Sequence, residues 1–213
     1  MKLKPFLLNR TQLLKIPELD LPQEAIESFD RFYTTLLTEG NATYSKEYPL
    51  YQFLNYLIEH KNILVHGSNH PSIHTFEPKE SALFNNKPIK AVFASSDGVW
   101  SLFFAVLDKK TSHSIRNLCL TSQTRKGIKR YYYFSINEHM NENRWTNGTI
   151  YFFPKNRFKQ GGIENEWVCE TEVEPLAKLE VKPEDFPFLD NVMRHSDKES
   201  VIATIVKGFV KKK

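Results

Sequence analysis

The sequence predicts an α+β protein in which helical segments flank a mainly antiparallel set of strands. Two segments near the start, residues 21–39 and 48–60, repeat apolar residues at helical spacing. Between residues 114 and 181 the pattern changes to short runs rich in Val, Ile, Tyr and Phe, separated by turns that contain Gly, Asn and Lys. Helical spacing returns at residues 198–210. Such an order of elements is typical of an α+β fold.

The two N-terminal helices are predicted from their apolar stripes. One face of the first helix carries Ala25, Phe29, Phe32 and Leu36, and Gly40 can end the helix. The second helix follows the i, i+3, i+4, i+7, i+8 pattern at Leu50, Phe53, Leu54, Leu57 and Ile58. We expect a helical cap over residues 1–61, packed on an α+β domain over residues 62–213 within one compact unit.

The centre of the chain contains two predicted strands, the second of which leads into a helix. Residues 63–65 are an apolar run that ends in His66, Gly67 and Ser68. Residues 91–94 form the second run, and Asp97 is one of three residues that can cap a helix over residues 96–107. Residues 70–90 are predicted to be a loop with a helical turn near residues 80–83, and residues 185–194 a helix.

Composition bounds the class of protein. The 213 residues are enough for one domain with an accessory element, and the net charge is +4. Cys119 and Cys169 lie in predicted strands, without the spacing of zinc ligands, so we expect a reducing compartment and no metal. The N-terminal apolar run is too short for a signal peptide or a membrane span. We expect a cytoplasmic protein with no membrane partner.

Three segments resemble the ADP-ribosyltransferase fold, in the branch of diphtheria toxin and the poly(ADP-ribose) polymerases. LVHGS, residues 64–68, resembles that family's L-x-H-G-S/T strand. VFASSDGVWSLFFA, residues 92–105, resembles its next strand and helix, and IENEWVCETEV, residues 163–173, resembles the strand that begins at its glutamate. The three pieces occur in the family's order. The resemblance implies split antiparallel β-sheets and a site for NAD as substrate.

The resemblance assigns NAD contacts to the first segment. His66 would hydrogen-bond the adenosine ribose, while Gly67 and Ser68 would hold the carboxamide of the nicotinamide. The structural alternatives are a histidine satisfied by backbone, a turn glycine and a serine that caps a turn.

The second segment would supply the aromatic wall of the pocket. Phe103 stands where the family's stacking aromatic usually lies, and Phe104 and Phe93 are its neighbours. Aromatic residues at helical spacing are also typical of a core. No tyrosine matches the middle member of the family's His-Tyr-Glu set, because Val92 and Phe93 fill that strand.

The third segment carries the candidate catalytic carboxylates. Cleaving the nicotinamide–ribose bond develops positive charge on the ribose, which a nearby carboxylate stabilises. The resemblance gives this role to Glu166, and Glu164 matches the first glutamate of the E-x-E pattern, which orients the acceptor in the arginine-modifying branch. The alternative is an exposed strand-start glutamate. If the site works, Glu166→Gln should abolish nicotinamide release and leave folding intact, since one strand-start carboxylate contributes little to stability. We expect Glu166 to lie beside the His66 turn.

The resemblance therefore implies an NAD-binding ADP-ribosyltransferase that releases nicotinamide and modifies an unknown protein or nucleic-acid acceptor. One alternative is a catalytically inactive member of the fold that acts as a binding module. The other is an RNA-directed NAD-dependent enzyme, suggested by the basic residues of segment 125–130 beside three tyrosines. A solvated hairpin turn would explain that segment equally simply.

Overall fold

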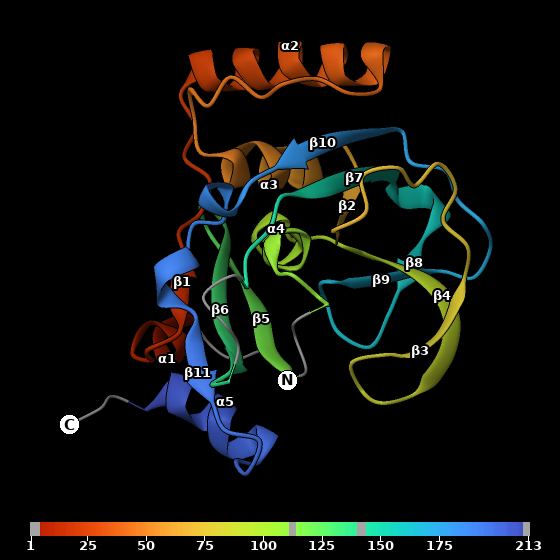
Figure 1. Cartoon of the computed structure of the whole chain (residues 1–213). Helices are drawn as coiled ribbons and strands as arrows, with labels where there is room; N and C mark the ends of the chain where they lie inside the picture. The colour runs from red at the N-terminus through yellow and green to blue at the C-terminus, as the bar shows by residue number, and fades with distance from the viewer. Residues whose placement is uncertain (1–4, 111–113, 140–143, 211–213) are drawn as a thin grey trace. The chain divides into compact units, whose positions relative to one another are not determined.

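The computed structural model describes residues 5–110, 114–139 and 144–210. Within those residues it contains five α-helices and two mainly antiparallel sheets, so the α+β prediction is confirmed (Figure 1). The chain divides into two compact units. Unit 1 combines Met1–Leu19, Asp108–Arg144 and Phe188–Lys213, and unit 2 combines Asp20–Leu107 with Trp145–Pro187.

The helices of unit 2 include both helices expected to form the N-terminal cap. They are α2 (Gln23–Glu39), α3 (Leu50–His60) and α4 (Gly98–Val106). Helix α2 ends at Gly40, whose φ of 71° is easy for glycine and whose N–H bonds to the carbonyl of Leu36. Helix α4 is capped by Asp97, which accepts a hydrogen bond of 2.8 Å from the backbone of Trp100. Both predicted ends are confirmed.

The sheet of unit 2 has the strand order β10-β7-β2-β4-β9-β8, with β3 paired to β4. All its register pairs are antiparallel. Its strands are β2 (Ile63–Ser68), β3 (Lys79–Ala82), β4 (Pro88–Ser95), β7 (Gly148–Pro154), β8 (Lys159–Gln160), β9 (Glu166–Cys169) and β10 (Ala177–Val181). The short 3-10 helix η1 (Lys155–Arg157) lies between β7 and β8, and η2 (Pro183–Asp185) follows β10.

Helix α4 lies unusually close to one face of this sheet because two glycines leave room for it. A Cβ on Gly67 would lie 2.0 Å from the carbonyl oxygen of Ser101, and one on Gly148 would lie 1.9 Å from that of Ala105. Neither distance is compatible with a side chain. The opposite face carries an apolar cluster formed by Leu64, Phe76, Val92, Ala94, Tyr151, Phe153, Phe158, Cys169 and Val173.

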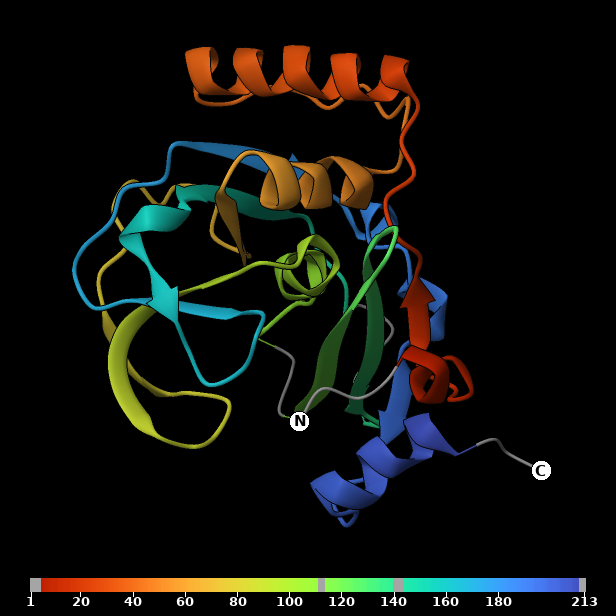
Figure 2. The same cartoon turned by 180° about the vertical axis from the view of Figure 1, so that it is seen from behind.

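Unit 1 is built on the long hairpin of β5 (Ile115–Thr124) and β6 (Gly127–Asn137), the two green strands in Figure 2. On β6, the short strand β1 (Leu14–Ile16) pairs antiparallel and β11 (Met193–His195) pairs parallel. Helices α1 (Pro5–Asn9) and α5 (Val201–Phe209) complete the unit together with the 3-10 helix η3 (Leu189–Asn191). Both cysteines of the chain are buried.

Two predicted segments differ from the structure. Residues 70–90 are not one loop, because β3 and the first half of β4 form a hairpin there and the expected helical turn is a strand. Residues 185–194 do not form an α-helix: they contain the last residue of η2, the 3-10 helix η3 and part of β11. In both segments pairing with a distant or adjacent strand decides the structure. No helix in the described part of the chain is long and apolar enough to cross a membrane.

Candidate functional site

The three segments that suggested an NAD site lie on neighbouring strands of the unit 2 sheet. His66 is on β2, the second segment begins on β4, and Glu166 opens β9. Val65 pairs with Ser95, and Ser95 pairs with Glu166. Residues about 100 positions apart in the sequence therefore lie in one row across three strands.

The sequence suggested that Glu166 lies beside the His66 turn, but the structure separates the two residues. Strand β4 separates them, so two strand spacings, about 10 Å, lie between β2 and β9. Side chains alternate between the faces of a sheet. His66 therefore shares a face with its partner Tyr151, whereas Glu166 shares the opposite face with Ser95, so the prediction that the two residues lie side by side is wrong.

The ladder between β2 and β4 is short, which brings His66 to a place where the two strands part. Among the described residues, β2 and β4 have one register pair, Val65 with Ser95. On its other edge β2 is paired with β7 as far as Ser68. Beyond that pair, Nδ1 of His66 lies 2.8 Å from the carbonyl oxygen of Phe93 on β4. The histidine is thus satisfied by backbone, with its ring also edge-on to Phe76 at 5.2 Å.

The Glu166 side chain is buried, with 8% of its surface exposed, and it joins two loops. Its carboxylate accepts a hydrogen bond of 2.6 Å from the N–H of Gly162, in the β8–β9 turn. It also accepts from the N–H of Phe84, at the tip of the β3–β4 hairpin, with oxygen distances of 3.1 and 3.3 Å. We call this arrangement the Glu166 clasp. The alternative of an exposed strand-start glutamate is wrong.

The β8–β9 turn is shaped around this carboxylate. A Cβ on Gly161 would lie 2.6 Å from Oε2 of Glu166, so glycine is the residue that permits the approach. Glu164 is exposed on the same turn, and its carbonyl accepts a weak bond of 3.5 Å from the side-chain amide of Gln160. The two candidate carboxylates thus differ in burial.

Gly67 and Ser68 have structural roles at the end of β2. Position 67 requires glycine because a side chain there would collide with the backbone of α4. Ser68 is buried, and its hydroxyl accepts a hydrogen bond of 3.1 Å from the N–H of His70. Ser68 agrees with its structural alternative, whereas Gly67 is a strand residue paired with Ile150 and not a turn glycine.

The aromatic candidates divide into core and surface. Phe103 is fully buried, and its ring packs against Phe104, Trp145 and Phe186 at 5.4–6.3 Å, which favours the core alternative. Phe104 and Phe93 are each half-buried. They are the candidate aromatics that keep ring surface available to a ligand.

Sequence reasoning missed Tyr151 and Trp167, which lie on the His66 face of the sheet. The hydroxyl of Tyr151 donates to the carbonyl of His70 at 2.6 Å and accepts from the N–H of Ile73 at 3.0 Å, and burial raises the pKa of this phenol. Trp167 is half-buried and donates to the hydroxyl of Ser96 at 3.1 Å. Their positions follow from register, which no local pattern indicates.

The basic segment 125–130 belongs to the β5–β6 hairpin of unit 1, as its structural alternative predicted. Arg125 and Lys126 are exposed at the turn, whereas Arg130 is fully buried. The ammonium of Lys129 lies 5.9 Å from the ring centre of Tyr131. The basic residues therefore do not form one continuous surface of the kind that binds RNA backbone.

A cavity of about 440 Å³ lies in unit 2 beyond the end of β2. Asn69 and Thr149, the partner of Ser68, are among its polar lining residues, together with Asn41, Lys46 and Glu180. The lining includes neither His66 nor Glu166. The described residues contain no group of three or more His, Cys, Asp or Glu side chains arranged to hold a metal ion.

Comparison of the chain with protein-family models, with curated proteins and with solved structures gives no significant match.

Proposed function

We propose that unit 2 is an NAD-binding domain of the ADP-ribosyltransferase kind, which releases nicotinamide and transfers ADP-ribose to an acceptor. The row Val65–Ser95–Glu166 carries this proposal. Three segments that resemble the family's consecutive motifs occupy three consecutive strands of one sheet, although they are far apart in the sequence. Core packing alone does not require that coincidence.

The proposed ligand lies along the end of the β2–β4 ladder. Because side chains alternate between the faces of a sheet, binding of one molecule to both His66 and Glu166 requires the ligand to pass around the end of this ladder. His66 would bond the adenosine ribose, and Phe93 or Phe104 would face the nicotinamide ring. The ring of Phe103 is not part of this site.

Glu166 would stabilise the ribose as positive charge develops on it. A carboxylate offers about four lone-pair positions, and the clasp provides two N–H donors, from Phe84 and Gly162. A ribose hydroxyl can therefore bond the same carboxylate while the clasp persists. The burial of Glu166 requires the hairpin tip or the β8–β9 turn to make room for that hydroxyl.

Release of nicotinamide from NAD by the purified full-length chain tests the proposal. Glu166→Gln should reduce the rate on the order of 100-fold or more, because it removes the charge that stabilises the transition state. Glu164→Gln is the matched control. Loss of this exposed carboxylate should leave the hydrolysis of NAD unchanged and should reduce the transfer of ADP-ribose to an acceptor. His66→Ala should weaken NAD binding.

Absence of both NAD binding at millimolar concentration and nicotinamide release would reject the proposal. Equal release by the wild type and Glu166→Gln would remove Glu166 from the reaction.

The second candidate is a non-enzymatic binding module of the same fold. The clasp favours it, since a carboxylate engaged by Phe84 and Gly162 already has a structural use. The same assay separates the candidates, because nicotinamide release that disappears in Glu166→Gln is incompatible with an inactive module.

A further inference from the structure

Helix α5 of unit 1 leaves a stripe of aliphatic side chains exposed. Its inward side consists of the buried Thr204 and Gly208 and of the partly buried Ile205 and Phe209, which pack on the sheet cluster. On its outer side Ile202 is 76% exposed and Val206 is 48% exposed, and Val201 and Val210 are also more than half exposed. The packing on the sheet therefore uses only part of the apolar surface of this helix.

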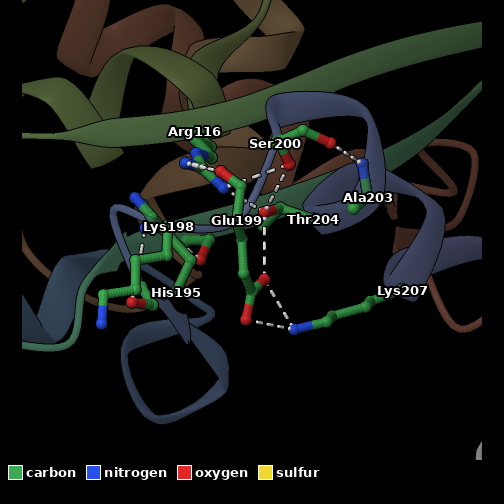
Figure 3. Close-up of polar contacts among 10 residues, drawn as sticks. Arg116, His195, Lys198, Glu199, Ser200, Ala203, Thr204 and Lys207 are labelled. Atoms are coloured by element: carbon green, nitrogen blue, oxygen red, sulfur yellow. Dashed lines mark hydrogen bonds and ion pairs between the residues drawn. The ribbon is translucent and has the colours of Figure 1, made fainter.

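Polar contacts with β5 fix this orientation (Figure 3). The guanidinium of Arg116 donates to the carbonyl of Glu199 at 2.7 Å and to the hydroxyl of Thr204. The carboxylate of Glu199 in turn accepts from Lys207 at 2.7 Å. The side of α5 that carries Thr204 is thereby held against the sheet.

Close packing at Gly208 supports the same orientation. A Cβ at this position would lie 2.7 Å from Cδ2 of Tyr133 on β6, so the helix backbone rests almost directly on that ring. Turning α5 to bury Ile202 and Val206 would replace glycine by a larger residue at this contact. The exposed apolar stripe is therefore a fixed feature of the unit, and exposed apolar patches of this kind mark interaction sites.

Helix α1 adds a second exposed apolar segment on the same side of the sheet. Leu8 of α1 and Ile205 of α5 pack into one cluster on β5 and β6, so both helices cover one sheet face. On its outer side α1 exposes 61% of Phe6 and 54% of Leu7. The guanidinium of Arg10 lies 4.2 Å from the ring centre of Phe6.

The sequence around these two helices is basic. Residues 1–10 and 201–213 contain seven Lys and Arg residues and no Asp or Glu. The whole chain has 29 basic and 25 acidic residues, so the remainder is acidic by three. Positive charge is thus concentrated at the two ends of the sequence, with Asp197 and Glu199 just before α5 and Glu199 paired with Lys207.

We propose that the outer faces of α1 and α5 bind the surface of a lipid bilayer that contains anionic lipids. Exposed apolar side chains in segments of basic sequence fit the apolar interior and the anionic headgroups of such a surface. A second copy of this face would meet the same positive charge and be repelled. Nucleic acid could stack on Phe6 but would gain little from the larger aliphatic stripe of α5, where Ile202 and Val206 offer no ring. The lack of a membrane-spanning segment, from which no membrane partner was expected, does not bear on surface binding.

Flotation of the full-length chain with vesicles tests this inference. The wild type should float with vesicles of equal parts phosphatidylglycerol and phosphatidylcholine at low salt, and should not float with pure phosphatidylcholine. The double variant I202D/V206D should lower the partition coefficient about tenfold or more. Leu37→Asp, at a 42% exposed position on α2 of unit 2, is the matched control and should bind as the wild type does. Circular dichroism should show that both variants keep the wild-type fold.

Three results would overturn the inference. The first is no flotation with anionic vesicles at low salt, and the second is equal flotation by the wild type and I202D/V206D. The third is a dimer of the wild type, abolished in I202D/V206D, in a chain that does not bind vesicles, since a second copy would then cover the face.

Discussion

The Glu166 clasp predicts that Glu166→Gln destabilises unit 2, contrary to the expectation for an exposed carboxylate. The amide keeps one acceptor oxygen, which can serve either Phe84 or Gly162. The other oxygen is replaced by an NH2 group that faces a backbone N–H. The hydrogen bond of 2.6 Å from Gly162 also loses its negatively charged acceptor. A hydrogen bond to a charged group contributes about 1.5–3 kcal/mol. We therefore expect a loss of about 2 kcal/mol in the free energy of unfolding, or about 4–8 °C in Tm.

Tryptophan fluorescence during urea unfolding measures this loss selectively. All three tryptophans, Trp100, Trp145 and Trp167, belong to unit 2, so their emission reports the unfolding of that unit. Glu164→Gln, on the exposed turn, should change the free energy by less than about 0.5 kcal/mol. If Glu166→Gln is equally neutral, the clasp does not stabilise unit 2 and the reasoning from its hydrogen bonds is refuted.

Two further predictions concern packing and protonation. Gly67→Ala should destabilise unit 2 by about 3 kcal/mol or more, because its Cβ would collide with the backbone of α4. Gly40→Ala meets no neighbouring atom and should cost about 1 kcal/mol, because its φ is positive. Tryptophan fluorescence during urea unfolding compares the two variants, and similar losses in the free energy of unfolding would contradict the packing argument. In unit 1, burial and then the charge of Arg116 lower the pKa of His195, so the folded state binds fewer protons than the unfolded state. The contribution of His195 to the free energy of unfolding should be fully present above the unfolded pKa of about 6.5 and should fall as the pH drops below it. Unfolding followed by circular dichroism at several pH values measures this decrease. The dependence of the free energy of unfolding on pH should be weaker in His195→Gln and unchanged in His139→Gln.

The helices were predictable because their signals are local. The apolar stripe and the terminal Gly40 identify α2, and the carboxylate of Asp97 three residues before the N–H of Trp100 identifies the start of α4. Each signal lies within one or two turns of the chain. The long β5–β6 hairpin was likewise indicated by two β-rich runs around Gly127.

The errors lie where distant partners decide the structure. The four residues of β3 are all exposed and show no apolar alternation, so only pairing with β4 makes them a strand. Asn86, with a φ of 64° at the hairpin tip, carries a turn signal that was interpreted as part of a loop. Strand β11 pairs with β6 about 60 residues earlier, where the ring of His195 bonds the hydroxyl of Ser135 at 2.8 Å. No local pattern contains that information.

The same limit applies to the candidate site. The motif around His66 and the glutamate at 166 could be selected from the sequence, because residue type and order carry them. Their faces depend on register, and the clasp depends on a contact between Phe84 and Glu166 across 82 residues. The division of the chain into two units has the same origin, since three separate segments assemble unit 1.

The clasp makes the stability and the activity of Glu166 variants separable quantities. Its donors are backbone N–H groups, so Gln can still accept one of them and unit 2 should remain folded after losing about 2 kcal/mol. Charge stabilisation at a ribose cannot be retained in part, because Gln carries no charge. A Glu166→Gln chain that is folded by tryptophan fluorescence but releases no nicotinamide would therefore assign the carboxylate to the reaction. A chain that loses stability while release continues would assign it to the β3–β4 hairpin alone.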